Sequence, residues 1–192
     1  MRVREKYEMK KEQFELIKKE YGMYSSFCVW GDTKSDLSIF DKEETLKDLH
    51  VDVIFLGINI SRPLEKAFAN FHDGRRGSQD GNLMNAVKET KYYGSYITDL
   101  YKDYVEVDGA SALSHFKNHP EEEKDQFDRL YQEIITVCGD ITPRFVLLKR
   151  DKQFEKAFLR FCEHLGVNYQ YMMTRHYAYG GTKEIKKDLE NN

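Results

Sequence analysis

The segment Val51–Phe71, VDVIFLGINISRPLEKAFANF, decides the fold. Its first six residues, 51–56, are almost all apolar and predict a buried strand. The strand breaks at Gly57, presents the polar Asn59, and then enters a loop that contains Pro63. In an open α/β sheet, ligands bind at the carboxyl ends of strands. Asn59 is therefore the first candidate for a site residue, although asparagine also serves as an ordinary turn residue.

Apolar runs and stretches of helical spacing alternate along the rest of the chain, which predicts further strands and helices. The other strands are expected at Ser95–Leu100, Pro143–Leu148 and Val167–Met173, and Ser25–Gly31 is open between a short strand and a buried loop. Helices are expected over Glu5–Tyr21, after Asp41, from Asn82, over Pro120–Cys138, after Asp151 and from Thr182, and a helical turn over Leu64–Phe71. This order predicts a single α/β domain over residues 1–192, a three-layer α/β/α arrangement with a central, mainly parallel four-stranded sheet.

Composition excludes several classes of protein. The net charge of −3 is not the basic balance of a nucleic-acid coat protein, so a polyanion would have to meet a local patch. The three cysteines lack CxxC spacing, which predicts reduced thiols in a cytoplasmic protein and no zinc ribbon. A charged start and the lack of a long apolar run predict neither a signal peptide nor a membrane partner.

The absence of several sequence motifs excludes further kinds of chemistry. The chain has no GxxxxGK[ST] or GxGxxG loop to hold a nucleotide and no GxSxG nucleophile elbow. The pair His72-Asp73 is weak evidence for a metal, and His115 and His119 are interpreted as surface residues because Pro120 follows them. We therefore expect neither a metal nor an organic cofactor.

Three motifs carry a family resemblance. Gly57-Ile58-Asn59 ends the first firm strand, Phe71 follows twelve residues after Asn59, and Ile97-Thr98-Asp99-Leu100 lies in the next strand. This layout resembles the uracil-DNA glycosylase superfamily, most closely its mismatch-specific uracil/thymine-DNA glycosylase branch. In that branch a strand ends in Gly-Ile-Asn-Pro-Gly, and a phenylalanine about a dozen residues later stacks on the flipped base.

The resemblance implies an enzyme that binds DNA, flips a uracil, mismatched or modified pyrimidine, and hydrolyses its N-glycosidic bond. Asn59 would position water and His176 would donate to the leaving base or contact phosphate. The implied base-binding residues are Gly57, Ile58, Phe71, His72 and Asp73, and the implied DNA-binding residues are Arg75, Arg76, Arg175 and Tyr177. From the residues alone, Phe71 is equally a core ring and the arginines are equally solubilising charge, whereas a loop-supporting role is favoured for Asp73.

Departures from the family pattern leave other functions open. Ile60 and Ser61 replace its Pro and Gly, and the last loop reads His176-Tyr177-Ala178 where the family has Asn/His-Pro-Ser. The resemblance covers about Val51–Leu189, so Met1–Lys47 is expected to be a family-atypical helical extension. One alternative is a catalytically inactive glycosylase-like module that binds nucleic acid or a protein; another is a flavodoxin-like small-ligand domain.

Overall fold

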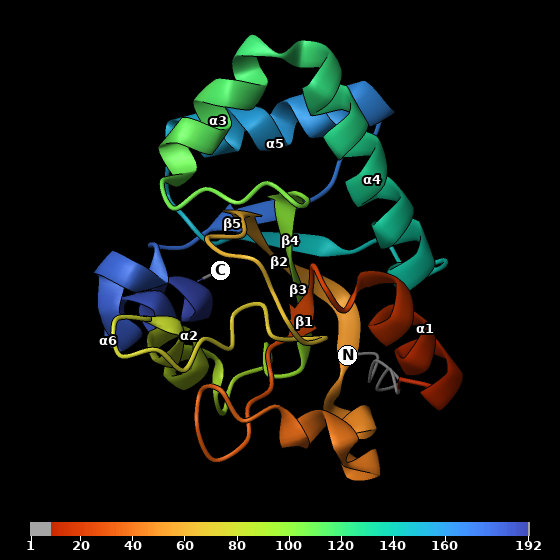
Figure 1. Ribbon diagram of the computed structural model, residues 1–192, viewed down its shortest axis with the longest axis vertical. Helices are drawn as coiled ribbons and strands as arrows, with labels where there is room; N and C mark the ends of the chain where they lie inside the picture. The colour runs from red at the N-terminus through yellow and green to blue at the C-terminus, as the bar shows by residue number, and fades with distance from the viewer. Residues whose placement is uncertain (1–8, 192) are drawn as a thin grey trace.

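The computed structural model describes residues 9–191, in which helices surround a central sheet (Figure 1). The predicted start of the first helix at Glu5 lies outside the described residues. The sheet has the strand order β1-β3-β2-β4-β5. Its strands are β1 (Ser26–Phe27), β2 (His50–Asn59), β3 (Ser95–Tyr101), β4 (Arg144–Leu147) and β5 (Tyr171–Met173). All neighbouring pairs are parallel except β1 and β3, which are antiparallel.

The α/β class is confirmed, but the expectation of four strands is wrong. The fifth strand, β1, comes from the segment 25–31 and pairs its two residues with Ile97 and Tyr96 of β3. A strand of two residues is too short to show an alternating pattern, which explains why the sequence did not decide between a strand and a buried loop in this segment. The first 47 residues are therefore not only a helical extension, because they also contribute an edge strand to the sheet.

The helices mostly follow the predicted positions. They are α1 (Lys11–Tyr21), η1 (Leu37–Asp41), η2 (Glu43–Asp48), α2 (Asp80–Val87), α3 (Gly109–Asn118), α4 (Pro120–Cys138), α5 (Lys152–Leu165) and α6 (Tyr177–Glu190). The Asp151 side chain accepts hydrogen bonds from two backbone N–H groups and caps α5, as predicted. The helical turn expected over residues 64–71 is wrong, because these residues form bends and non-helical turns. Helix α3 was not predicted.

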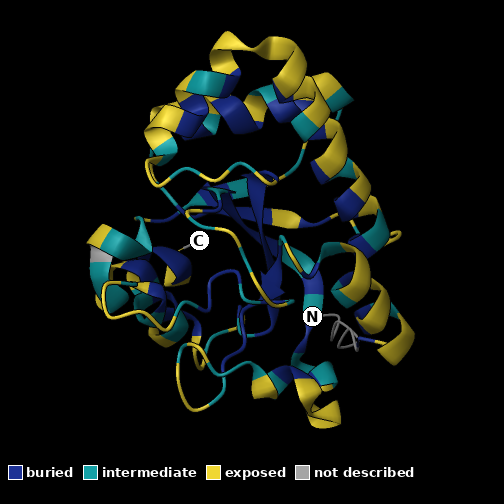
Figure 2. Ribbon diagram, in the orientation of Figure 1, coloured by how far each residue is buried: buried dark blue, intermediate teal, exposed yellow. Residues whose placement is uncertain are grey.

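Two apolar clusters lie on opposite faces of the sheet, as alternation along a strand requires. Ile54 and Leu56 of β2 belong to one cluster with residues of α1, α3, α4 and α5. Phe55 points the other way and packs with residues of α2 and α6. Figure 2 shows the resulting buried strands between partly exposed helices. No helix within residues 9–191 combines the length and apolar character needed to cross a bilayer.

The topology brings several loops to one edge of the sheet. From β2 the chain goes to β3 on one side, and then to β4 on the other side of β2. This is a topological switch point, and ligands bind outside the carboxyl ends of strands at such a point. The segments that leave β2, β3, β4 and β5 all begin at this edge because these strands are parallel.

Candidate functional site

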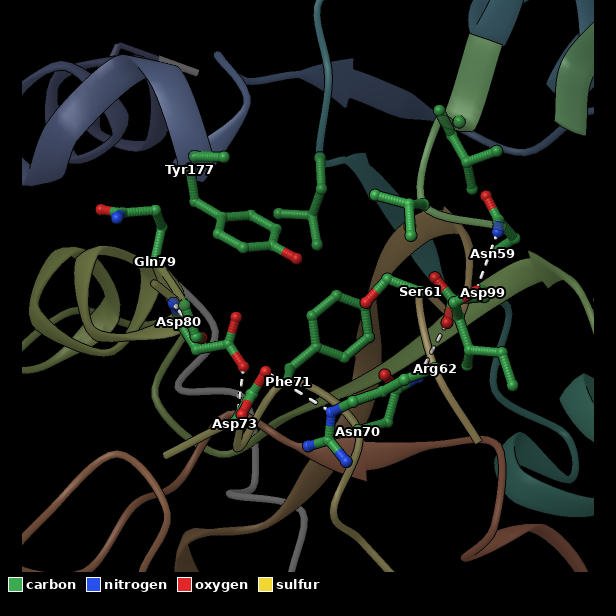
Figure 3. A pocket seen from close by; sticks show the side chains of 18 of the residues that line it. Asn59, Ser61, Arg62, Asn70, Phe71, Asp73, Gln79, Asp80, Asp99 and Tyr177 are labelled. Carbon is green, nitrogen blue, oxygen red and sulfur yellow. Dashed lines mark hydrogen bonds and ion pairs between the residues drawn. The ribbon is translucent and has the colours of Figure 1, made fainter. Parts of the chain in front are cut away.

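A cavity of about 560 Å³ lies at the carboxyl edge of the sheet. Residues 57–62 and 69–80 form much of its wall, and residues from 99–109, 148–154 and 176–179 complete it. Figure 3 shows side chains from these segments around one space. The volume lies in the range of pockets that hold small molecules, and it is large enough for a nucleobase. Of the sequence-predicted residues, eight line it: Gly57, Ile58, Asn59, Phe71, Asp73, Arg75, His176 and Tyr177.

Gly57 allows two important side chains to approach the backbone of β2. A Cβ atom at this position would overlap Oδ1 of Asp99 and would lie 2.9 Å from Cζ of Phe71. Gly57 and Asp99 are also partners in the pairing of β2 with β3. The glycine therefore lets a carboxylate and an aromatic ring meet over bare backbone on one side of the cavity.

Asn59 ends β2 with its carboxamide held by the backbone. Its Nδ2 donates to the carbonyl oxygens of Ile60, Tyr104 and Glu106 over 2.9, 3.1 and 2.7 Å. Three carbonyl acceptors around one end of the amide define which end is nitrogen. Oδ1 accepts no hydrogen bond from another described residue, so it is the atom that remains for a ligand or water.

This arrangement gives a testable stability effect. We expect Asn59→Asp to lower the free energy of unfolding by about 1–3 kcal/mol, because a carboxylate cannot donate to three backbone carbonyls. Thermal and urea unfolding near neutral pH measure the loss. The control is Asn168→Asp, at an exposed amide, where we expect a change within about 0.5 kcal/mol. Equal stability of Asn59→Asp and the wild type would contradict the holding role.

Phe71 is held in an unusual backbone conformation beside the cavity. Its φ of 61° lies in the left-handed region, which costs a bulky residue about 1–2 kcal/mol. The Trp30 indole N–H donates to the Phe71 carbonyl at 3.2 Å, and the ring meets Tyr177 edge-on at 6.2 Å. In Figure 3 the Phe71 ring lies between Tyr177 and Asp99. The surrounding contacts thus maintain a strained residue whose ring lines the cavity.

His72 lies behind the cavity, not in its wall. Its two ring nitrogens lie 2.8 Å from the carbonyl oxygens of Asn70 and Val29, and the ring stacks on Trp30. Burial lowers the pKa of this imidazole. The structure therefore gives His72 a supporting role for the loop, because its side chain points away from the space that a base would occupy.

The loop after Phe71 contains a compact ion cluster. The Arg75 guanidinium donates to Asp73 through Nε at 2.8 Å and approaches it through Nη2 at 2.7 Å, and Arg62 lies 3.4 Å away. Burial alone would raise the pKa of Asp73, but the hydrogen bonds from Arg75 hold it below its ordinary value. Asp73 thus holds the loop, while Arg76 and Arg175 are exposed and do not line the cavity.

Asp99 is the residue that sequence reasoning missed as a site residue. It is 2% exposed, lines the cavity, and accepts a hydrogen bond from Asn70 Nδ2 at 2.8 Å. Burial raises its pKa to about 6. Such a shift at a cavity is typical of functional carboxylates. An aspartate in the otherwise weakly polar strand segment Tyr96–Tyr101 was the available signal.

The imidazole of His176 is neutral and oriented by the start of α6. Its Nδ1 accepts a hydrogen bond from the Ala178 N–H at 3.1 Å, which leaves the proton on Nε2. Burial, helped by the charge of Lys149, lowers its pKa to about 4. The ring stacks on Tyr177 at 4.7 Å, and Figure 3 shows the Tyr177 hydroxyl pointing into the cavity. Both side chains are neutral hydrogen-bond donors near neutral pH.

No family model, curated protein or solved structure matches the chain. Its chemistry is therefore inferred from the residues that meet at the cavity. These comprise the largely buried ring of Phe71, a buried carboxylate at Asp99, an oriented amide oxygen at Asn59, and neutral donors at His176 and Tyr177. Such a set can stack on a flat ring, hydrogen-bond its edge, and hold a water molecule.

Proposed function

We propose that the protein is a DNA glycosylase of the uracil-DNA glycosylase type, with a three-layer α/β/α fold. It flips a uracil, mismatched or modified pyrimidine into the cavity and hydrolyses the N-glycosidic bond. One observation carries the proposal: Asn59, Phe71 and Asp99, from three separate segments, line one cavity of about 560 Å³. The exposed Arg76 and Arg175 are the candidate phosphate contacts.

The positions of Asn59 and Asp99 along their strands support one orientation of the base in the cavity. Asp99 pairs with Gly57, whereas Asn59 pairs with Tyr101, two residues further along the strands. Asn59 therefore lies about 7 Å nearer the strand ends than Asp99. A base whose face stacks on Phe71 would place an N–H edge against the Asp99 carboxylate and its sugar near Asn59. Stacking of this kind contributes about 1–3 kcal/mol per base.

The same orientation supports hydrolysis without a charged catalyst at the sugar. Oδ1 of Asn59 accepts a hydrogen bond from water and aims its oxygen at C1′. The C1′–N bond breaks with its electron pair on the base, the water oxygen bonds to C1′, and its proton passes to solvent. Nε2–H of His176 donates to the anionic base as it leaves, and donors aimed at developing charge are effective in a partly dry site.

A second candidate function follows from the contacts of Asn59. Because its Nδ2 holds three carbonyls of the neighbouring backbone, this residue also has a full structural role without catalysis. A glycosylase-like module that binds nucleic acid or a protein would keep the cavity and lack the reaction.

A strand-cleavage assay separates the two. Labelled duplexes that carry uracil, thymine or modified cytosine opposite guanine are incubated with the protein and then treated with alkali, which breaks the strand at an abasic site. We expect breaks with at least one base, and their loss in Asn59→Ala under conditions where circular dichroism shows that the variant is folded. DNA binding without breaks for any base would support the inactive module and contradict the enzyme.

A further inference from the structure

A cluster of metal-ligand side chains lies away from the cavity, where α3 meets α4. His115 is near the end of α3, His119 is at the junction, and Glu122 is in the first turn of α4. One ligand atom from each lies within 4.8 Å of the others. None of the three lines the cavity. We propose that these three side chains bind a divalent transition-metal ion of the zinc class.

The hydrogen bonds prepare His119 as a ligand. Its Nδ1 lies 2.7 Å from the carbonyl oxygen of His115, and a carbonyl can only accept. The proton is therefore on Nδ1, and the lone pair of Nε2 is available to a metal. Metal-binding histidines usually donate their other ring N–H to a carbonyl or carboxylate, which fixes the ring in this way.

His115 is held on both sides. Its ring stacks on that of His119, with centroids 4.3 Å apart, and on Tyr104 at 5.0 Å. Its Nε2 lies 3.1 Å from Oε2 of Glu122, so in the metal-free protein the Nε2 proton bridges the two groups. A metal ion bound to Nε2 would require the other neutral tautomer of His115, in which the proton has moved from Nε2 to Nδ1.

Binding of an ion requires a local rearrangement of these surface side chains. Zinc bonds of about 2.0–2.2 Å to nitrogen and oxygen place tetrahedral ligand atoms about 3.3–3.6 Å apart. The Glu122 side chain is 58% exposed and can rotate toward the ion. The exposed His119 ring must also turn out of its stack on His115, because a metal binds in the plane of each imidazole. Three protein ligands leave a fourth position open to water.

The donor set also indicates which metals bind. Two imidazoles and one carboxylate suit Zn²⁺, Ni²⁺ and Cu²⁺, whereas Mg²⁺ prefers an all-oxygen set. An ion here would connect the end of α3 to the start of α4 across Pro120. Since such an ion binds the folded chain in preference to the unfolded one, it would raise the unfolding temperature.

The experiment uses untagged full-length protein stripped of metal with a chelator. Isothermal titration calorimetry with zinc chloride is expected to show one equivalent bound, and magnesium chloride none. We expect His119→Ala and Glu122→Gln each to weaken zinc binding at least tenfold, with unchanged circular dichroism. His164→Ala is the matched control, because His164 is another surface histidine beside a carboxylate, 2.8 Å from Asp128.

Two outcomes would overturn the proposal. One is the absence of stoichiometric zinc binding by the wild type at micromolar concentrations. The other is zinc binding that persists in both His119→Ala and Glu122→Gln, or that His164→Ala weakens as much. Because the cavity shares no residue with this cluster, strand cleavage is expected to be unchanged in both variants, so the two proposals can fail independently.

Discussion

We expect Asp99→Asn to raise the free energy of unfolding by about 2–3 kcal/mol near pH 8 and to change it little near pH 4. Burial raises the pKa of Asp99 to about 6 from an ordinary 3.8. Protonation therefore stabilises the folded chain, fully below about pH 4, and this stabilisation is lost as the pH rises through 6. Asparagine still accepts from Asn70 and carries no charge at either pH.

Urea unfolding of both proteins at the two pH values measures this effect. Asp140→Asn, at an exposed position in the turn after α4, is the control and is expected to change stability by less than about 0.5 kcal/mol. Destabilisation of Asp99→Asn near pH 8, or an equal change at both pH values, would show that burial does not destabilise the ionised Asp99 carboxylate in the folded protein.

The same variant tests the role of Asp99 in the proposed reaction. If the ionised carboxylate accepts a hydrogen bond from the base, strand cleavage by the wild type rises with pH through about 6 and then levels. The titration of His176 does not contribute to the rise in cleavage near pH 6, because its pKa is lowered to about 4. In Asp99→Asn we expect the rise near pH 6 to disappear. A rise that persists in this variant would assign it to another group.

Gly57→Ala is expected to abolish base binding, with strand cleavage reduced at least a hundredfold. The added methyl group would overlap Asp99 Oδ1 and lie 2.9 Å from Cζ of Phe71, so the carboxylate and the ring must move apart. Overpacking of this kind also lowers the free energy of unfolding by about 1–3 kcal/mol. Single-turnover cleavage and thermal unfolding measure the two effects.

Gly77→Ala is the matched control for this substitution. Gly77 lies in the exposed loop that forms part of the cavity wall, and an added Cβ there would meet no atom within 4 Å. We expect it to change cleavage less than threefold. If Gly57→Ala cleaved as well as Gly77→Ala, the space between Asp99 and Phe71 would not be the base site.

Strong local signals made much of the fold predictable. The apolar run before Gly57 and the cap at Asp151 both specify elements through their own side chains. Helix α3 was missed because it begins Gly-Ala-Ser and buries only Ala112, Leu113 and Phe116. The helical turn expected at 64–71 does not form because Phe68 and Phe71 adopt left-handed conformations, and tertiary contacts such as the Phe68 N–H to the Gly22 carbonyl maintain that loop.

The sequence predicted site residues correctly only where their spacing along the chain was sufficient to identify them. The interval between Asn59 and Phe71 indicated two residues that do line one cavity. His72 was assigned to the site because it follows Phe71 in the sequence, but the side chains of these two adjacent residues point in different directions. Asp99 stands out locally as an aspartate in a weakly polar strand, but its place in the site depends on the register of β3 against Gly57, which is a long-range property.

Photocrosslinking tests the central claim most directly, because it reports where the base lies whether or not the bond is cleaved. A duplex that carries 5-iodouracil opposite guanine is irradiated with the protein, and the crosslinked peptide is identified by mass spectrometry. The proposed geometry predicts a crosslink to Phe71 or Tyr177, reduced in Gly57→Ala and retained in Gly77→Ala. Crosslinks confined to residues outside the cavity would contradict the proposal that a flipped base occupies it.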